Sequence, residues 1–277
     1  MSIYQELLEV AGQFGIQTRG LQGDLMCAFI GEWNAGKSAL INNLTGAELP
    51  CRPIQTTRAA VHLRHSETAE PYTKTIDHQE TVQHYHGAAA INALQCATTA
   101  TMRRIEFYSP TLDIPSQTIL VDTPGFNHTD AIATIGDTEQ IHADLVVWVL
   151  MGDGPLLNQQ QLDWVRRASH HCGTMDHLFF VVTHIDWFSH PETDRKAILD
   201  YWLARTGQEK ADQLFFVDNK SGEGIAEFKA KLYHAMAVQQ PILLEQRRQR
   251  YSRELLAQLQ VCITREQTLI EQWYRQC

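Results

Sequence analysis

The stretch Gly31-Glu-Trp-Asn-Ala-Gly-Lys-Ser38 constrains the fold of this 277-residue chain more than any other feature. It matches GxxxxGK[ST], follows the apolar run LMCAFIG and precedes a helical pattern, which is the context that this motif requires. Backbone N–H groups of such a loop curl around a β-phosphate, and the helix N-terminus adds its dipole. Lys37 is expected to neutralise β/γ-phosphate oxygens and Ser38 to ligate magnesium. The sequence therefore predicts a phosphate-binding loop between a strand and a helix.

Short apolar runs alternate with helical patterns along most of the chain, and this alternation predicts the fold class. We expect strands in LMCAFIG, TILVD, LVVWVL, LFFVVT and LFFVD, because such nearly continuous hydrophobicity is typical of strands buried on both faces. Helices are expected at residues 37–44, 158–169, 192–205 and 224–236. The pattern predicts an α/β fold with a doubly wound, mostly parallel sheet.

Three regions interrupt the alternation. Residues 66–104 hold many His, Thr and Gln residues, and we interpret them as an insertion within a domain of residues 24–238. Residues 1–23 and residues 239–277 each carry apolar positions at helical spacing. We expect these terminal helices to pack together as a small helical appendage.

Composition excludes some classes of protein. The formal net charge of −9, from 23 basic and 32 acidic residues, argues against broad electrostatic capture of nucleic acid. The six cysteines lack short ligand spacing, and the histidines crowded into residues 62–86 do not have the spacing of a zinc site. The N-terminus lacks a signal-peptide pattern, and no apolar run approaches the roughly 18 residues of a membrane span. We expect a cytoplasmic protein and leave peripheral membrane contact open.

A second motif, Asp122-Thr-Pro-Gly125, ends the apolar run TILVD. Its carboxylate is expected near the magnesium ion and the Gly125 amide near a γ-phosphate. A first-switch threonine, which ligates magnesium and holds the attacking water, is assigned to Thr57, four residues before the strand-like VHLRH. Thr56 is the alternative.

A third motif, Thr183-His-Ile-Asp186, follows the run LFFVV. Asp186 can accept two hydrogen bonds from guanine N1 and N2, a donor pair that adenine lacks. The loop holding Asn219 and Lys220 comes after the next apolar run and is expected to touch the base from the other side. The alternative is that THID only caps a helix.

The order of these motifs resembles a GTPase of the translation-factor-related class and, more narrowly, the bacterial dynamin-like GTPases. GEWNAGKSALINNLTG resembles their GxxxAGKSxLxNxLxG, IEFYSPTLDIPSQTILVDTPGF resembles their approach to the second switch, and helices flank the domain. The resemblance implies magnesium-dependent hydrolysis of GTP to GDP, dimerisation through the nucleotide face and movement of the appendage. The alternative function is a slowly hydrolysing switch that recruits a partner protein. Such a partner could add a helix to the appendage.

The predicted site follows from these motifs and the resemblance together. The predicted nucleotide-binding residues are Gly31, Glu32, Trp33, Asn34, Ala35, Gly36, Lys37, Ser38, Ala39, Asp122, Gly125, Thr183, His184, Asp186, Asn219 and Lys220. The predicted metal ligands are Ser38, Thr57 and Asp122, and the predicted catalytic residues are Lys37, Thr57, Asn34 and Gly125.

Three positions depart from the patterns that related GTPases share. Trp33 stands at a position where eukaryotic dynamins resemble one another in having a catalytic Gln. Phe126 directly follows DTPG, where small GTPases often have a Gln. His184 replaces the Lys that normally lies flat on guanine. An imidazole can also stack on a base.

The positive charge that accelerates hydrolysis therefore needs another source. Asn34 and the QTTR of residues 55–58 resemble Era-like GTPases, in which this Asn helps to hold potassium. We expect Asn34 to serve such a cation, with the site completed when two G domains meet. Arg52 or Arg58, acting as an arginine finger, is the rival source.

Overall fold

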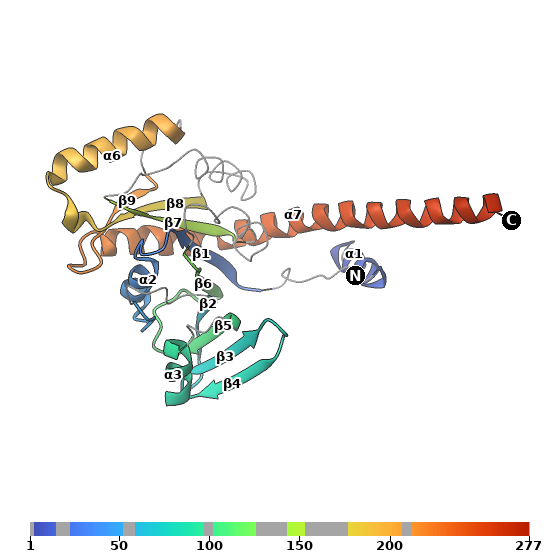
Figure 1. The fold of residues 1–277 in the computed structure, drawn as a ribbon, viewed down its shortest axis with the longest axis horizontal. Coiled ribbons are helices and arrows are strands. Elements are labelled where there is room, and N and C mark those ends of the chain that lie inside the picture. The colour runs from blue at the N-terminus through green and yellow to red at the C-terminus, as the bar shows by residue number, and fades with distance from the viewer. Residues whose placement is uncertain are drawn as a thin grey trace. The chain divides into compact units, whose positions relative to one another are not determined.

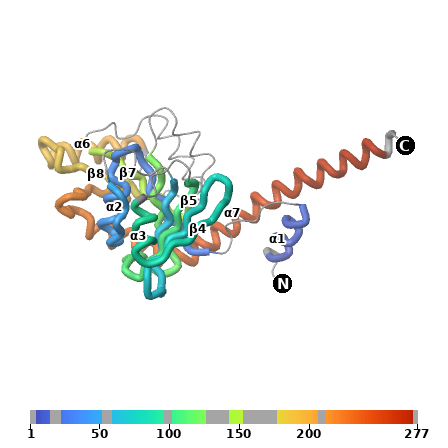
Figure 2. Tube along the Cα trace, turned by 60° about the horizontal axis from the view of Figure 1, so that its bottom comes forward, coloured from blue at the N-terminus to red at the C-terminus, as the bar shows by residue number. Residues whose placement is uncertain are grey.

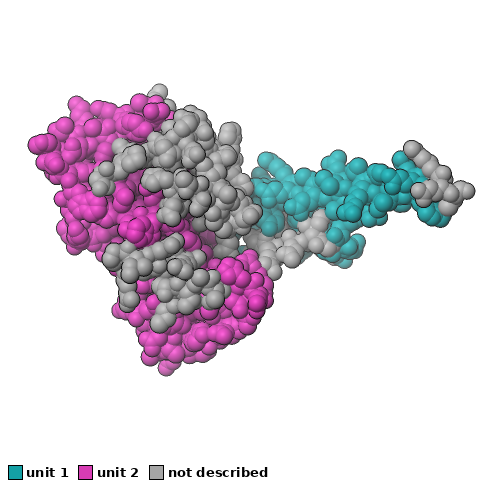
Figure 3. Space-filling view, viewed as in Figure 1, with its two compact units in different colours: residues 1–23, 239–277 teal, residues 24–238 magenta. Residues whose placement is uncertain are grey.

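The computed structural model describes residues 3–14, 23–51, 59–96, 102–125, 143–152, 177–206 and 212–276. The chain divides into two compact units, one of residues 24–238 and one of residues 1–23 with 239–277 (Figure 3). Several predicted features lie outside the described residues: Arg52, Thr56, Thr57, Arg58, Phe126 and the helix at 158–169.

The unit of residues 24–238 is built around a nine-stranded sheet in the order β4-β3-β5-β2-β6-β1-β7-β8-β9 (Figure 1). The strands are β1 Leu25–Gly31, β2 Ala60–His65, β3 Tyr72–Asp77, β4 Val82–His86, β5 Met102–Ser109, β6 Thr118–Asp122, β7 Leu145–Met151, β8 Leu178–Thr183 and β9 Leu214–Phe216. The helices of the described residues are α1 Ile3–Gln13, α2 Lys37–Thr45, α3 Ala88–Cys96, η3 Ile185–Trp187, α6 Pro191–Thr206 and α7 Ile225–Gln276. The five predicted apolar strands are confirmed as β1, β6, β7, β8 and β9.

Strands β6, β1, β7, β8 and β9 pair in parallel and are covered on both faces. On one face, Trp202 of α6 meets Phe180 of β8 edge to face, with ring centroids 5.5 Å apart. On the other face, Phe228 of α7 contacts Phe179 and Phe215. All of these side chains are buried within the apolar core. This burial on both faces confirms the doubly wound α/β fold predicted from the sequence.

The other half of the sheet contains the inserted residues. Strand β2 runs antiparallel to β6 and parallel to β5, while β3 runs antiparallel to β5 and to β4 at the edge. Helix α3 packs on β3, β4 and β5 (Figure 2). Buried Thr73 of β3 donates to the Ala90 carbonyl of α3 at 2.8 Å. The insertion therefore extends the main sheet, a result its polar composition did not predict.

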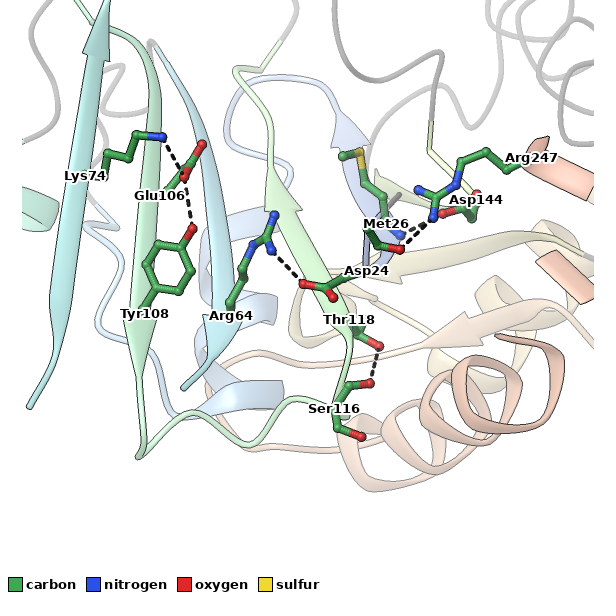
Figure 4. A network of polar contacts seen from close by, with 11 residues as sticks. Asp24, Met26, Arg64, Lys74, Glu106, Tyr108, Ser116, Thr118, Asp144 and Arg247 are labelled. Carbon is green, nitrogen blue, oxygen red and sulfur yellow. Dashed lines mark hydrogen bonds and ion pairs between the residues drawn. The ribbon is translucent and has the colours of Figure 1, made fainter. Parts of the chain in front are cut away.

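One face of this half of the sheet carries charged side chains that bond to one another (Figure 4). Glu106 is 8% exposed and lies 3.5 Å from Lys74 Nζ and 3.0 Å from Arg104 Nε, and it accepts a hydrogen bond from Tyr108 at 3.0 Å. Burial raises the pKa of Glu106, but the Arg104 charge and the Tyr108 bond outweigh it, so that pKa lies below its usual range. Compensation of this kind is what a buried carboxylate requires.

The unit of the two termini is a helix pair. Helix α1 packs on α7 around Ala11, Leu255 and Leu259, in agreement with the predicted appendage. Helix α7 is continuous from Ile225 to Gln276, whereas separate helices before and after Pro241 were expected. The φ of proline is already helical, but a proline within a helix removes one hydrogen bond and costs roughly 3 kcal/mol. Met236 and Leu243 on either side of Pro241 are buried, and this burial offsets that cost. None of the described helices has an apolar stretch long enough to cross a bilayer.

Candidate functional site

The predicted phosphate-binding loop connects β1 to α2 as expected. A Cβ atom at Gly31 would lie 2.3 Å from the Val149 carbonyl oxygen of β7, so only glycine fits there. Gly36 has a φ of +83°, and a Cβ there would lie 2.8 Å from the Asn219 amide nitrogen. The two glycines let the loop turn tightly between β7 and the Asn219 loop. The backbone is thereby brought close to the edge of the sheet where β1 ends.

Lys37 lies beneath this loop and is 6% exposed. Its Nζ donates to the Gly31 carbonyl at 3.0 Å and to the Glu32 carbonyl at 2.9 Å. Burial lowers the pKa of Lys37 to about 8, against the raising effects of Asp122 and Glu32. A buried ammonium group whose charge is only partly compensated is a suitable partner for a phosphate anion.

The second motif meets the first at the magnesium-binding position. The Ser38 hydroxyl donates to Asp122 Oδ2 at 2.6 Å, and Asp122 is 1% exposed at the end of β6. Hydroxyl and carboxylate oxygens are the hard ligands that Mg²⁺ prefers, so these residues fit the ion. A Cβ at Gly125 would lie 2.7 Å from the Trp33 Cα and 3.2 Å from Lys37 Nζ, which places the DTPG backbone against the phosphate-binding loop.

Two threonines tether these motifs to the sheet. Thr183 is completely buried, and its Oγ1 lies 2.8 Å from the Ala35 carbonyl oxygen and 3.0 Å from that of Leu150. The Thr123 hydroxyl donates to the Phe29 carbonyl of β1 at 2.7 Å. Both threonines belong to motifs that are recognisable in the sequence. The sequence carries no signal for these contacts, because the acceptors are backbone atoms far away in the chain.

The residues predicted to read the base converge beside the loop. Asp186 lies in η3, and Lys220 Nζ is 2.6 Å from its Oδ2. The Asn219 amide donates to the Gly36 carbonyl at 3.2 Å, and Asn43 of α2 donates to the Asn219 carbonyl at 3.0 Å. Asn43, which was not predicted, therefore holds the base loop against helix α2.

Asp218 shapes this base loop and was also missed. Its two carboxylate oxygens accept hydrogen bonds from the backbone N–H groups of Lys220 and Ser221, each at 3.0 Å. The side-chain hydrogen bond from Ser221 is the largest cause that lowers the pKa of Asp218. An Asp that begins a turn ending in Gly222 is a recognisable local signal, so this position could have been found in the sequence.

The remaining predicted loop residues differ in exposure. Asn34 is exposed and adopts a left-handed φ of +62°, a conformation that Asn tolerates better than most residues. Trp33 is 38% exposed, whereas Ala35 is buried and Ala39 is half-buried. Within the described ranges, no group of three or more His, Cys, Asp or Glu side chains is arranged to hold a metal ion.

A strand, a glycine-bounded loop and a helix, with Lys37, Ser38 and Asp122 gathered at their junction, define a P-loop nucleotide-binding domain. A family model described as the dynamin family matches residues 27–185, more than half of the chain. The chain therefore belongs to the dynamin family, as the resemblance of its motifs implied.

Solved structures share this fold. Two of them, each described as an oligomerised bacterial dynamin pair that provides a mechanism for the long-range sensing and tethering of membranes, superpose with TM-scores of 0.61 and 0.59. Their sequence identities are 17% and 15%, and the matches cover 83% and 89% of this chain. They cover only 37% and 38% of those longer chains. No curated protein sequence matches this chain significantly.

Proposed function

We propose that this chain binds GTP and hydrolyses it to GDP and phosphate as a dynamin-like GTPase. The convergence of the three predicted motifs at one edge of the sheet carries the proposal. Lys37 and Asp186 follow the ends of β1 and β8, and Asp122 is the last residue of β6. These strands run in parallel, so the three residues lie at the edge of the sheet where ligands of such sheets bind.

Phosphate binding is assigned to the loop of residues 31–38 and to Lys37. Lys37 would exchange its two carbonyl contacts for β/γ-phosphate oxygens, a stronger charge-assisted interaction. Ser38 and Asp122, with Thr57, would hold Mg²⁺, which supplies charge neutralisation on the phosphates when bound. The Gly125 amide would donate to the γ-phosphate, and its proximity to Lys37 supports this role.

Base selection is assigned to Asp186, with His184, Asn219 and Lys220 around the base. The Asp186 carboxylate accepts a hydrogen bond from the Lys220 ammonium, which supports a role as an acceptor for N–H donors at this position. Guanine provides two such N–H donors and adenine does not. We therefore expect GTP to be preferred over ATP.

Acceleration of hydrolysis is assigned to Thr57, which would hold the water, and to a potassium ion served by Asn34. Exposure of Asn34 at the loop surface supports a site that a second G domain completes. Turnover at constant ionic strength in potassium, sodium and lithium tests this, with Asn34→Ala and Arg58→Ala compared. Equal rates in all three salts and no loss in Asn34→Ala would eliminate the cation, while a selective collapse in Arg58→Ala would favour an arginine finger.

The wider proposal is a cytoplasmic protein whose G domains dimerise in response to nucleotide and whose state moves the paired terminal helices. Membrane contact is a separate question: the structural neighbours are described as sensing and tethering membranes, and sedimentation with anionic vesicles in GDP and in GTP would decide it for this chain. A helical partner protein is a further expected ligand.

The second candidate function is a slowly hydrolysing switch that recruits a partner. This function is favoured because Trp33 stands at the position of the catalytic Gln. Multiple-turnover phosphate release over a range of protein concentrations separates the two. A rate per molecule that rises with concentration supports the dimerising GTPase, and a slow, concentration-independent rate supports the switch.

Asp186→Asn tests the base assignment directly. Its amide presents an N–H donor to the guanine amino group, so GTP binding should fall. Xanthosine triphosphate, which carries an oxygen in place of that amino group, should bind the variant better than the unmodified protein. Equal competition by GTP and ATP in the unmodified protein would contradict guanine selectivity.

A further inference from the structure

We propose that the Trp187 indole and the His184 imidazole form an aromatic platform on which the nucleotide base stacks, so that Trp187 is a nucleotide-binding residue. This inference rests on the proposed GTP site and adds to it a surface for the flat face of the base. Asp186, by contrast, is assigned to the edge of the base.

The two rings already contact each other. Their centroids are 4.3 Å apart with an interplanar angle of 40°, and the backbone N–H of Trp187 donates to the His184 carbonyl at 3.0 Å. His184 has a left-handed φ of +55°, a backbone conformation that is uncommon for residues other than glycine. The turn between them therefore holds the two rings in contact with each other.

The platform begins at the phosphate-binding loop. His184 Cε1 lies 3.5 Å from the position that a Cβ of Gly36 would occupy, and His184 Nδ1 is 2.9 Å from the Thr183 hydroxyl. The imidazole therefore lies between the loop and the indole. A nucleotide with its phosphates in the loop has to extend along this line for its base to reach Asp186.

The indole is left exposed where the neighbouring side chain is not. Within η3, Ile185 is 5% exposed and anchors the turn in the core, whereas Trp187 is 49% exposed. A large exposed aromatic surface beside an acceptor such as Asp186 matches a purine, which has an apolar π-face and a polar edge. Stacking of one base on an aromatic side chain typically changes affinity by about tenfold or more.

A platform for the flat face makes a prediction that differs from the one for Asp186. Every purine has a π-face, so loss of the platform should weaken GTP and ATP by a similar factor and leave their ratio unchanged. Loss of the edge contact at Asp186 should change that ratio instead. The ratio therefore separates stacking from recognition of the base edge.

The experiment is calorimetric titration of GTP, GDP and ATP into Trp187→Ala, Trp187→Phe and His184→Ala. Trp273→Ala removes an exposed tryptophan from the C-terminal part of α7 and is the matched control. We expect affinity for GTP and GDP to fall about tenfold in Trp187→Ala, to change little in Trp187→Phe and not to change in Trp273→Ala. His184→Ala should also weaken both nucleotides.

Unmodified affinity in Trp187→Ala, with unfolding temperatures of the variants equal, would overturn the platform. A loss in Trp187→Ala that changes the ratio of GTP to ATP affinity would also overturn it, since the indole would then act on the base edge. If the unmodified protein binds no guanine nucleotide, the GTP site itself is wrong. If the unmodified protein and Trp187→Ala bind GTP with equal affinity, the platform is wrong and the GTP site still stands.

Discussion

The two halves of the nine-stranded sheet are built on different principles. Strands β6, β1, β7, β8 and β9 are parallel and packed on both faces, and every residue of β6 and β8 is buried. Strands β2, β3 and β5 also have buried positions, but these include polar residues such as His62, Thr75 and Glu106, and β4 is mostly exposed. The first half is recognisable from hydrophobicity alone, and the second is not.

The difference also separates the candidate site from the rest of the sheet. Parallel strands bring their carboxyl ends to the same edge, so loops after β1, β6 and β8 can meet around one ligand. In the other half, Glu106 of β5 bonds to Lys74 of the inserted strand β3 and to its own neighbours Arg104 and Tyr108, away from these loops. Substitutions in the parallel half should therefore change nucleotide binding, while matched substitutions in the insertion should not.

Lys37→Ala gives the largest expected effect. Removing a buried charge that pairs with phosphate costs about 2 to 5 kcal/mol, which is a loss of roughly thirtyfold to several thousandfold in GTP affinity. Lys74→Ala in β3 is the matched control, because it removes a lysine whose partner is a protein carboxylate, Glu106, and not a phosphate. Titration of both variants with GTP checks the comparison. Equal affinity in the two variants would contradict the P-loop assignment.

Gly31→Ala in the parallel half should be far more damaging than Gly87→Ala in the insertion. The new Cβ would lie 2.3 Å from a backbone oxygen, and overpacking against backbone costs about 3 kcal/mol or more in the free energy of unfolding. Gly87→Ala in the insertion adds a Cβ 3.2 Å from the flexible end of the Glu70 side chain at a φ of +55°, and we expect about 1 kcal/mol. Urea denaturation measures both. A larger loss at Gly87 would reverse the comparison.

Thr183→Val and Thr75→Val compare one buried hydroxyl from each half. The Thr183 hydroxyl bonds to backbone carbonyls. Loss of this hydroxyl should lower the free energy of unfolding by about 1 to 3 kcal/mol and weaken nucleotide binding. Thr75 Oγ1 is buried and has no hydrogen-bond partner among the described residues. Valine there should leave stability unchanged or raise it slightly, since Val suits a strand. Denaturation curves that move equally for both would show that Thr183 does not tether the loop.

The pH dependence of binding gives the smallest effect. Lys37 in the free protein has a pKa lowered to about 8 by burial, and bound phosphates would raise that pKa. Affinity for GDP should therefore be full below about pH 8 and fall above it by up to about tenfold per pH unit. Calorimetry in buffers of different ionisation enthalpy should detect uptake of about one proton near pH 9. Flat affinity across this range, without proton uptake, would show that Lys37 stays charged in the free protein.

The sequence anticipated features that depend on local patterns. The P-loop context, the strands of the parallel half and the pairing of α1 with α7 follow from apolar runs and helical spacing, and the structure confirms them. Continuity of α7 through Pro241 was not anticipated, because a proline's local cost is visible in the sequence while the packing that offsets it is not.

By itself, the sequence determined the class of fold and the position of the P-loop motif, because both are encoded by residue types at short spacing. Only the tertiary structure decided that the insertion joins the main sheet, that Thr183 and Thr123 tie their motifs to distant backbone carbonyls, and that Asn43 holds the base loop. These contacts join residues far apart in the chain, and their partners are backbone atoms that every residue carries. No side-chain pattern can therefore specify them, and the packed sheet selects them by placing those atoms within reach.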